Sequence, residues 1–220
     1  MVGKIDKVIV TNLSALSQKY GTKGMRAIRA GIRRLIAADK KRGLRTILLG
    51  LDDKSRMKSL ASPTVAHAHN PKQNKAAIDG IYRALAPDYI MILGSRYVIP
   101  HQDLLNLAFS RRESGDPDKF AWGDLPYACE APYSQSIKDF QGPTRVVGRL
   151  PDITGGSDAK YLVGLLRTAA RYKQVDEAAL THYFAVSARA WQRQTARVLK
   201  AAGIREVFAL TAARVVTGRR

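Results

Sequence analysis

The amino-acid sequence predicts an α/β protein, a parallel sheet sandwiched by helices in a three-layer, Rossmann-like arrangement. Short apolar runs rich in β-branched residues alternate with segments that place apolar side chains at helical spacing. The apolar runs are continuous rather than alternating with polar residues, which is typical of strands covered on both faces. At 220 residues and 45% hydrophobic composition, the chain is long enough to bury a core.

The first strand is expected at residues 8–13, where a β-branched run ends in polar side chains. Gly21 and Thr22 follow, and Thr22 is a suitable helix N-cap. The helix expected after Thr22 has one apolar face, made of Met25, Ile28, Ile32, Leu35 and Ile36. Gly43 ends that pattern, and residues 45–51 are the second expected strand.

A second helix is expected to begin at Asn70 and Pro71 and to end before Pro87. Residues 89–93 follow as the strongest expected strand. From residue 99 to 142 the periodicity disappears, and proline, glycine, aspartate and serine are frequent. This segment is therefore expected to be a long connection with short elements, a kind of loop that is commonly functional.

The last third of the sequence continues the alternation. Residues 145–150 are expected to form a fourth strand, followed by a helix capped by Ser157 or Asp158. A longer helical pattern covers about 177–202, and residues 206–210 resemble a fifth strand. The order of elements again indicates a parallel sheet with helical crossovers.

Composition limits the function classes. The net charge of +19 comes mainly from residues 1–60, with 15 basic and 4 acidic side chains, and from residues 145–220, with 14 and 5. A single cysteine excludes an internal disulfide framework and a four-cysteine zinc module. The charged N-terminus does not resemble a secretory signal, and no apolar run is long enough for a membrane span. These features predict a cytoplasmic protein.

Four segments between residues 87 and 172 form an ordered set of motifs. They are Pro87-Asp-Tyr-Ile-Met-Ile-Leu-Gly94 with Val98-Ile-Pro100, Gly123-Asp-Leu-Pro-Tyr127, Val146-Val-Gly-Arg-Leu-Pro151, and a helix ending Ala170-Arg-Tyr172. This set resembles the gingipain-type cysteine peptidases, which are relatives of caspases and clostripain. The resemblance covers about 85 residues, and residues 1–86 share only the α/β alternation.

The resemblance implies two stacked α/β subdomains, the first at 1–140 and the beginning of a second, caspase-like one at 141–220. In the family, the catalytic histidine ends a strand in a Gly-His-Gly context, and the catalytic cysteine lies in a Cys-x-x-Gly turn. Residues 1–220 contain neither motif. The expected protein is therefore a fragment or truncated relative of a gingipain-like cysteine endopeptidase without its own catalytic dyad. Its expected partner is the catalytic part or another protein chain, and the apolar faces of residues 161–170 and 180–199 would then be uncovered.

His101 and Cys129 are the candidate catalytic pair if the chain is active. Both lie in loops expected near the carboxyl edge of the sheet, where active sites of this fold class gather. A cysteine peptidase needs a thiolate, an imidazole that accepts its proton and an oxyanion hole. The alternative is that Cys129 is a small, half-buried apolar residue and His101 a hydrogen-bonding loop residue.

The remaining candidate sites each have a structural interpretation, and some of them also have a functional one. Asp124 is a candidate for binding a basic substrate side chain, or an Asx-turn or cap that organises its loop. Arg149 is expected to be a paired, structural residue that joins the two subdomains. His67 and His69 form either a metal pair or part of a solvated loop, and no metal or cofactor is expected. The Gly155-Gly156 pair lacks the lysine and the spaced glycines of a phosphate loop.

Basic side chains recur at three- and four-residue steps on two expected helices. The candidates for binding nucleic acid or a partner protein are Arg26, Arg29, Arg33, Arg34, Arg189, Arg193, Arg197 and Lys200. A non-enzymatic basic α/β module that binds nucleic acid or a protein is thus the alternative to the peptidase relative. The structural interpretation is a solvated helix face, and it also stays open.

Overall fold

The computed structural model of the chain describes residues 4–111, 116–173, 175–176, 187, 191–201 and 203. The chain divides into two compact units, residues 1–172 and residues 173–220. Each unit is described by itself below.

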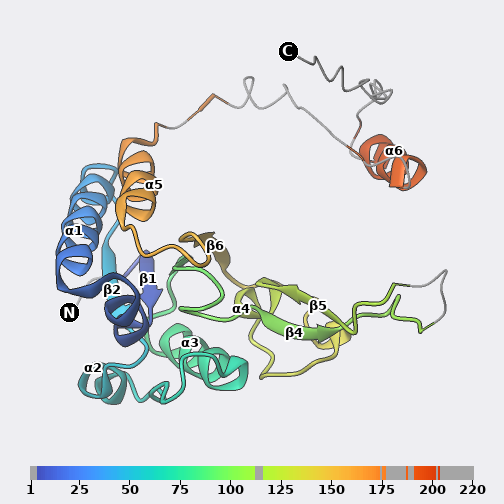
Figure 1. Ribbon diagram of the computed structural model, residues 1–220, viewed down its shortest axis with the longest axis horizontal. Coiled ribbons are helices and arrows are strands. Elements are labelled where there is room, and N and C mark those ends of the chain that lie inside the picture. The colour runs from blue at the N-terminus through green and yellow to red at the C-terminus, as the bar shows by residue number, and fades with distance from the viewer. Residues whose placement is uncertain are drawn as a thin grey trace, which may run out of the picture. The chain divides into compact units, whose positions relative to one another are not determined.

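The first unit is built on a four-stranded parallel sheet (Figure 1). Its strands, in the spatial order β2-β1-β3-β6, are β2 (Thr46–Gly50), β1 (Lys7–Thr11), β3 (Tyr89–Leu93) and β6 (Val146–Leu150). All three neighbouring pairs are parallel, which confirms the expected parallel α/β sheet for the first four strands. Residues 8–10 of the central strand β1 are fully buried, as a continuous apolar run requires.

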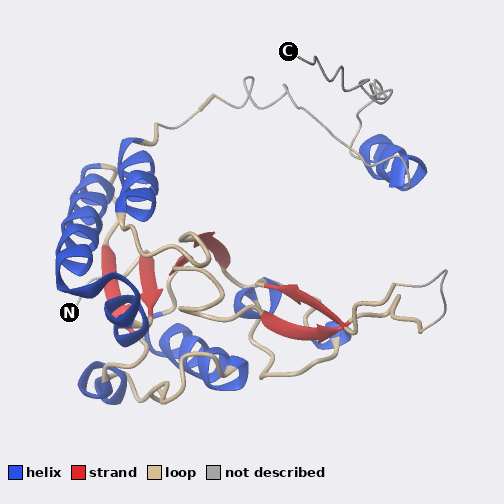
Figure 2. Cartoon of the chain, in the orientation of Figure 1, coloured by secondary structure: helices blue, strands red, loops and turns tan. Residues whose placement is uncertain are grey.

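Helices cover the sheet in the way that its strand order demands. The connection from β1 to β2 and the connection from β2 to β3 cross the sheet in opposite directions, so right-handed crossovers put their helices on opposite faces. Figures 1 and 2 show this arrangement: α1 and α5 lie side by side on one face of the sheet, and α3 lies on the other. The helices are α1 (Leu13–Lys41), α2 (Lys54–Ser59), α3 (Pro71–Leu85) and α5 (Lys160–Arg171).

Helix α1 begins ten residues earlier than expected, at Leu13 instead of after Thr22. The Asn12 side chain accepts a hydrogen bond from the backbone N–H of Ala15 at 2.8 Å and so caps the helix. Gly21, with φ of 59°, interrupts the helical backbone without ending the helix. The break at Gly21 therefore marks a kink in one helix and not its beginning.

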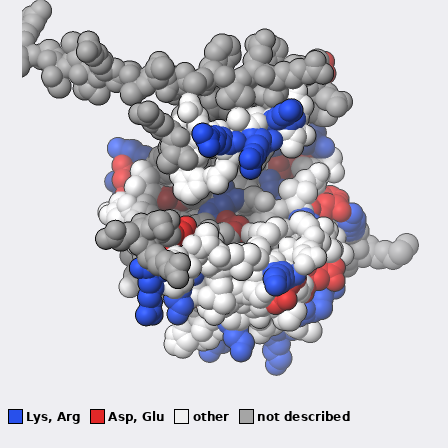
Figure 3. Space-filling view, turned by 90° about the vertical axis from the view of Figure 1, so that its right-hand side faces the viewer, with Lys and Arg blue, Asp and Glu red and all other residues white. Residues whose placement is uncertain are grey.

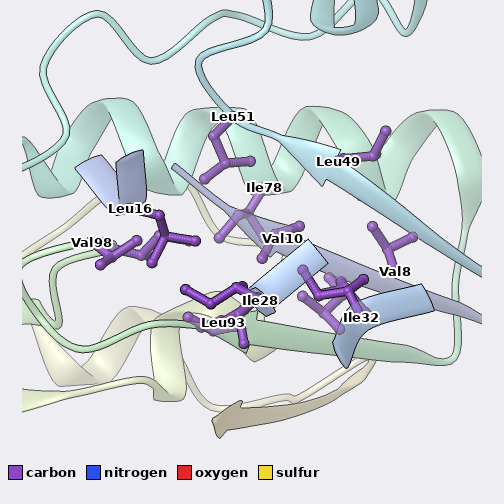
Figure 4. Close-up of a cluster of buried hydrophobic side chains, with 14 of the residues drawn as sticks. Val8, Val10, Leu16, Ile28, Ile32, Leu49, Leu51, Ile78, Leu93 and Val98 are labelled. Carbon is purple, nitrogen blue, oxygen red and sulfur yellow. The ribbon is translucent and has the colours of Figure 1, made fainter. Parts of the chain in front are cut away.

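The core lies between α1, α5, α3 and the sheet. Figure 4 shows side chains of α1 converging on Val8 and Val10 of β1. Leu162 and Leu166 of α5 are fully buried, and Gly31 of α1 leaves the space that Leu166 fills. The apolar face expected to be uncovered at residues 161–170 is thus largely covered by α1.

The long connection between residues 99 and 142 contains short elements that lie outside the main sheet. Strands β4 (Gln102–Leu105) and β5 (Phe120–Gly123) pair antiparallel as a separate two-stranded sheet. Helix α4 (Leu125–Ala128) and a 3₁₀ turn at Ile137–Asp139 complete the segment. It leaves the carboxyl end of β3 and returns to the amino end of the parallel edge strand β6.

The boundary between the two units differs from the one expected at residue 140. Strand β6 is hydrogen-bonded to β3, and α5 packs on α1, so both elements belong to the first unit. The described part of the second unit contains α6 (Gln192–Ala201). Most of the helix expected at 177–202 and the strand expected at 206–210 lie outside the described residues. Among the helices described, none is both long and apolar enough to cross a membrane.

Candidate functional site

The Arg149 guanidinium joins the sequence motifs at the carboxyl end of the sheet. Its Nε and Nη2 each donate to the Asp124 carboxylate at 2.7 Å. Its Nη1 donates to the carbonyl oxygens of Gly94 and Ile99, both at 2.9 Å. A forked guanidinium suits this bidentate pairing. One side chain thus connects β6, the end of β3, the loop after it and the residue before α4.

Asp124 is bound by protein groups on both carboxylate oxygens. His101 Nδ1 lies 2.9 Å from the same Asp124 oxygen that Arg149 Nη2 contacts. Asp124 precedes α4 but makes no capping hydrogen bond, so its role is an ion pair and not the Asx-turn or cap of the structural interpretation. Arg149 joins loops within one unit, and not two subdomains as expected.

Acid should weaken this ion pair selectively. Burial favours a raised Asp124 pKa, but the hydrogen bonds from Arg149 and His101 outweigh burial and lower the pKa to about 2. Because the folded pKa lies below the unfolded value, the stabilisation is complete above about pH 4 and is lost as the pH falls toward 2. Between pH 6 and pH 2.5, the wild type should lose about 1–2 kcal/mol more unfolding free energy than Asp124→Asn.

Chemical denaturation of both proteins across this pH range measures the difference. Asp88→Asn is the matched control, since Asp88 forms an exposed ion pair with Lys4. The control should follow the wild type in acid. Parallel loss of stability in the wild type and Asp124→Asn would show that folding does not lower the pKa of this carboxyl group.

Cys129 lies in a different environment from His101. The residue is 2% exposed and packs in an apolar cluster with Leu104 and Phe140. Burial raises the pKa of its thiol, although Arg145 and Lys75 nearby partly oppose that effect. Thiolate formation is therefore disfavoured, and the thiol is shielded from solvent. In the part of the chain that the structure describes, His101 pairs with Asp124 and forms no hydrogen-bonded dyad with Cys129.

A buried ion cluster holds the long connection against the sheet. Lys75 of α3 is fully buried and donates to Asp79 and to the Cys129 carbonyl oxygen, at 3.1 Å for the latter. Arg145 donates to Asp79 at 2.7 Å and to the Tyr127 carbonyl oxygen at 2.8 Å. Burial lowers the Lys75 pKa and raises the Asp79 pKa, because both groups lose hydration. This cluster was not predicted from the sequence, although Lys75 and Asp79 share the helix face of Ile78.

A cavity of about 370 Å³ opens at the carboxyl edge of the sheet. It lies beside the ends of β1 and β3, where the chain connections leave in opposite directions, which is the usual ligand position in open α/β sheets. Its polar lining includes Asn12, Ser14, Gln18, Asp52 and His69. The Asp52 carboxylate accepts hydrogen bonds from the backbone N–H groups of Leu13 and Ser14 at 2.8 and 2.7 Å. These two N–H groups at the start of α1 are therefore already hydrogen-bonded.

A second cavity, also of about 370 Å³, shares Lys19 and Tyr97 with the first. Gly155 and Gly156 line it. Lys19 is held by Asp152, which also accepts hydrogen bonds from the Tyr20 hydroxyl and the Ser95 backbone N–H. Burial raises the Asp152 pKa, but these donors outweigh it and the pKa is lowered. Asp152 was not predicted from the sequence, although its place two residues after the fourth strand is a signal that could have indicated this second anchored carboxylate.

The two candidate metal-binding histidines have different surroundings. His69 lines the first cavity, and its ring lies edge-on to Tyr97 with centroids 6.4 Å apart. The His67 backbone N–H donates to the Gln73 side-chain oxygen at 2.9 Å. Within the described ranges, no three histidine, cysteine, aspartate or glutamate side chains are grouped to hold a metal ion.

The basic candidate residues are distributed over both units. Arg26, Arg29, Arg33 and Arg34 are exposed on α1. On α6, in the second unit, the exposed basic residues are Arg193, Arg197 and Lys200. Arg189 lies outside the described residues. The structure thus places the α1 set on the outer surface of the first unit, away from the buried core.

Comparison of the chain with protein-family models, curated proteins and solved structures found no match in any of the three. The resemblance to gingipain-type peptidases consequently rests on the sequence motifs and their order.

Proposed function

We propose that residues 4–172 form the non-catalytic α/β subdomain of a gingipain-like cysteine endopeptidase. In this role the unit supports a catalytic subdomain and does not cleave peptides itself. The observation that supports the proposal most directly is the convergence of the family-like motifs on Arg149. Residues of these motifs that are 25 to 55 positions apart in sequence make contact through one guanidinium.

The chemistry of the candidate dyad supports a non-catalytic role. A peptidase thiol must be accessible and near a base that accepts its proton. Cys129 is buried in an apolar cluster with a raised pKa, and His101 is bound to Asp124. Neither group is arranged for attack on a peptide carbonyl in this unit.

The proposal predicts that the chain supplies activity only in combination with a catalytic subdomain. The experiment mixes the purified chain with the catalytic subdomain of a gingipain-type peptidase, expressed without its first subdomain. Hydrolysis of fluorogenic arginine and lysine peptides and co-elution on size exclusion are measured. We expect a complex that hydrolyses the peptides, while the chain alone does not.

Two variants make the result specific. Arg149→Ala should lose both complex and activity, because the motif loops lose their common anchor. Arg83→Ala changes an exposed arginine on α3 and should keep both. Hydrolysis by the chain alone that Cys129→Ala and His101→Ala both abolish would contradict the proposal and restore the dyad. Absence of a complex with intact subdomains would also count against it.

A further inference from the structure

The outer surface of α1 and α5 carries basic side chains without acidic neighbours. Seven exposed basic residues lie on α1 and two lie in the second half of α5: Lys23, Arg26, Arg29, Arg33, Arg34, Lys40, Lys41, Arg167 and Arg171. Lys160, at the start of α5, is also exposed but is paired with Asp158 and is not counted with them. These nine residues are called the cationic layer. The only acidic residue in the segments 13–42 and 160–172 is Asp39, which is 1% exposed and paired with Lys7 and Arg42. Among the described residues, no member of the layer forms an ion pair.

The two helices present these charges together. Leu166 of α5 packs against Gly31 of α1. At the other end, Arg42 Nη2 donates to the carbonyl oxygens of Ala170 and Tyr172, at 2.6 and 2.9 Å. The layer is therefore a fixed surface of the first unit. Another face of the molecule differs from it: Figure 3 shows basic and acidic side chains interspersed there.

The spacing of the cations on α1 is unfavourable for an isolated helix. Arg29 and Arg33 are four residues apart, and Arg26 and Arg29 are three apart, so like charges are neighbours on the helix surface. Such pairs destabilise a helix unless an anion neutralises them. From Arg26 to Lys41 the ridge extends about 22 Å, which corresponds to about six base pairs of duplex.

The uncharged residues exposed on α1 help to select the kind of anion. Between residues 22 and 41, the exposed positions that are not basic are Thr22, Ala27 and Ala37. Protein interfaces need large apolar or aromatic anchors, and a membrane-bound helix needs an apolar face toward the lipid. Amide and carboxylate side chains, which read adenine and cytosine, are absent from the exposed positions of that stretch. What remains is contact with a regular array of phosphates.

We infer that the cationic layer binds the phosphate backbone of double-stranded DNA without sequence specificity. The inference is independent of the peptidase proposal, because the four arginines that test it, Arg26, Arg29, Arg33 and Arg34, lie on α1, outside residues 87–172 that carry the motifs. Six of the nine cations are arginines, whose planar guanidinium groups pair with phosphate through two hydrogen bonds.

Fluorescence anisotropy with a labelled 20-base-pair DNA, between 50 and 300 mM salt, tests the inference on the full chain. At physiological salt a dissociation constant of about 1–100 µM is expected, with a steep loss of affinity as salt rises. A variant with Arg26, Arg29, Arg33 and Arg34 all replaced by Ala should bind at least about tenfold more weakly. The slope of log K against log[salt] should become shallower by about 3 to 4.

The matched control removes four exposed charges from another part of the first unit: Lys54, Arg56, Lys58 and Lys72, each replaced by Ala. The two variants have the same net charge as each other, because each loses four positive charges. Circular dichroism checks that both are folded. The control should retain DNA affinity within about threefold, and DNAs of different sequence should bind equally. Equal losses in the two variants would assign binding to net charge alone and overturn the inference. Absence of binding, or at least about tenfold tighter binding of duplex RNA or heparin at equal salt, would also overturn it.

Discussion

Replacing Asp79 with alanine should lower the free energy of unfolding by about 3–5 kcal/mol, because it leaves two buried cations without their shared counter-ion. The side chains of Lys75 and Arg145 are both fully buried, and Asp79 contacts each of them. The remaining hydrogen-bond partners are the carbonyl oxygens of Cys129 and Tyr127 and the Thr144 hydroxyl, none of which carries a full charge. Since whole domains are stable by only about 5–15 kcal/mol, this loss is a large fraction of the total.

Urea or guanidinium unfolding, followed by circular dichroism, measures the effect. The matched control is Asp88→Ala, whose pair with Lys4 is more than half exposed on both sides, and which should change stability by less than about 1 kcal/mol. Adding Lys75→Met to Asp79→Ala should recover more than about 1 kcal/mol, since one of the two unpaired cations is then gone. An Asp79→Ala variant within 1 kcal/mol of the wild type would mean that the cluster is open to solvent.

Truncating Leu166 should be the second large effect, with a loss of about 2–5 kcal/mol for Leu166→Ala. Leu166 is fully buried between α5 and α1, and Gly31 leaves room for its side chain and no more. Removal of its three outer carbons leaves a cavity that the glycine opposite cannot fill. The same measurement of unfolding free energy applies.

Two variants separate the packing effect from a general effect on α5. Leu166→Met keeps the side-chain volume and should cost less than about 1.5 kcal/mol. Thr168→Ala changes an exposed position on the same helix and should change stability by less than about 0.5 kcal/mol. If Leu166→Ala cost no more than Thr168→Ala, α5 would not belong to the cooperative core of the first unit.

The candidate site was predictable only in part. The motifs around Asp124 and Arg149 were visible in the sequence, and so was the need for a buried arginine to be paired. Which groups pair was not, because the partners are 25 residues apart and meet only when β6 takes its place beside β3. The burial of Cys129 likewise depends on Leu104 and Phe140, which approach it from other parts of the long connection.

The sequence by itself determined the local elements and the fold class. Continuous apolar runs form strands only when both faces are covered, so the runs at residues 8–10, 46–50 and 89–93 already required a helix-covered parallel sheet. The helix expected to begin at Asn70 and Pro71 begins there, because its cap and its first residue are local signals. Tertiary structure decided what depends on distant segments. The strand order, the cavity at the carboxyl edge and the binding of Asp52 from another loop to the N-terminus of α1 all require contacts that no local pattern records. Hydrogen bonds between such segments form only after the sheet has brought the segments together. Their contribution to stability therefore cannot be predicted from any short stretch of the sequence.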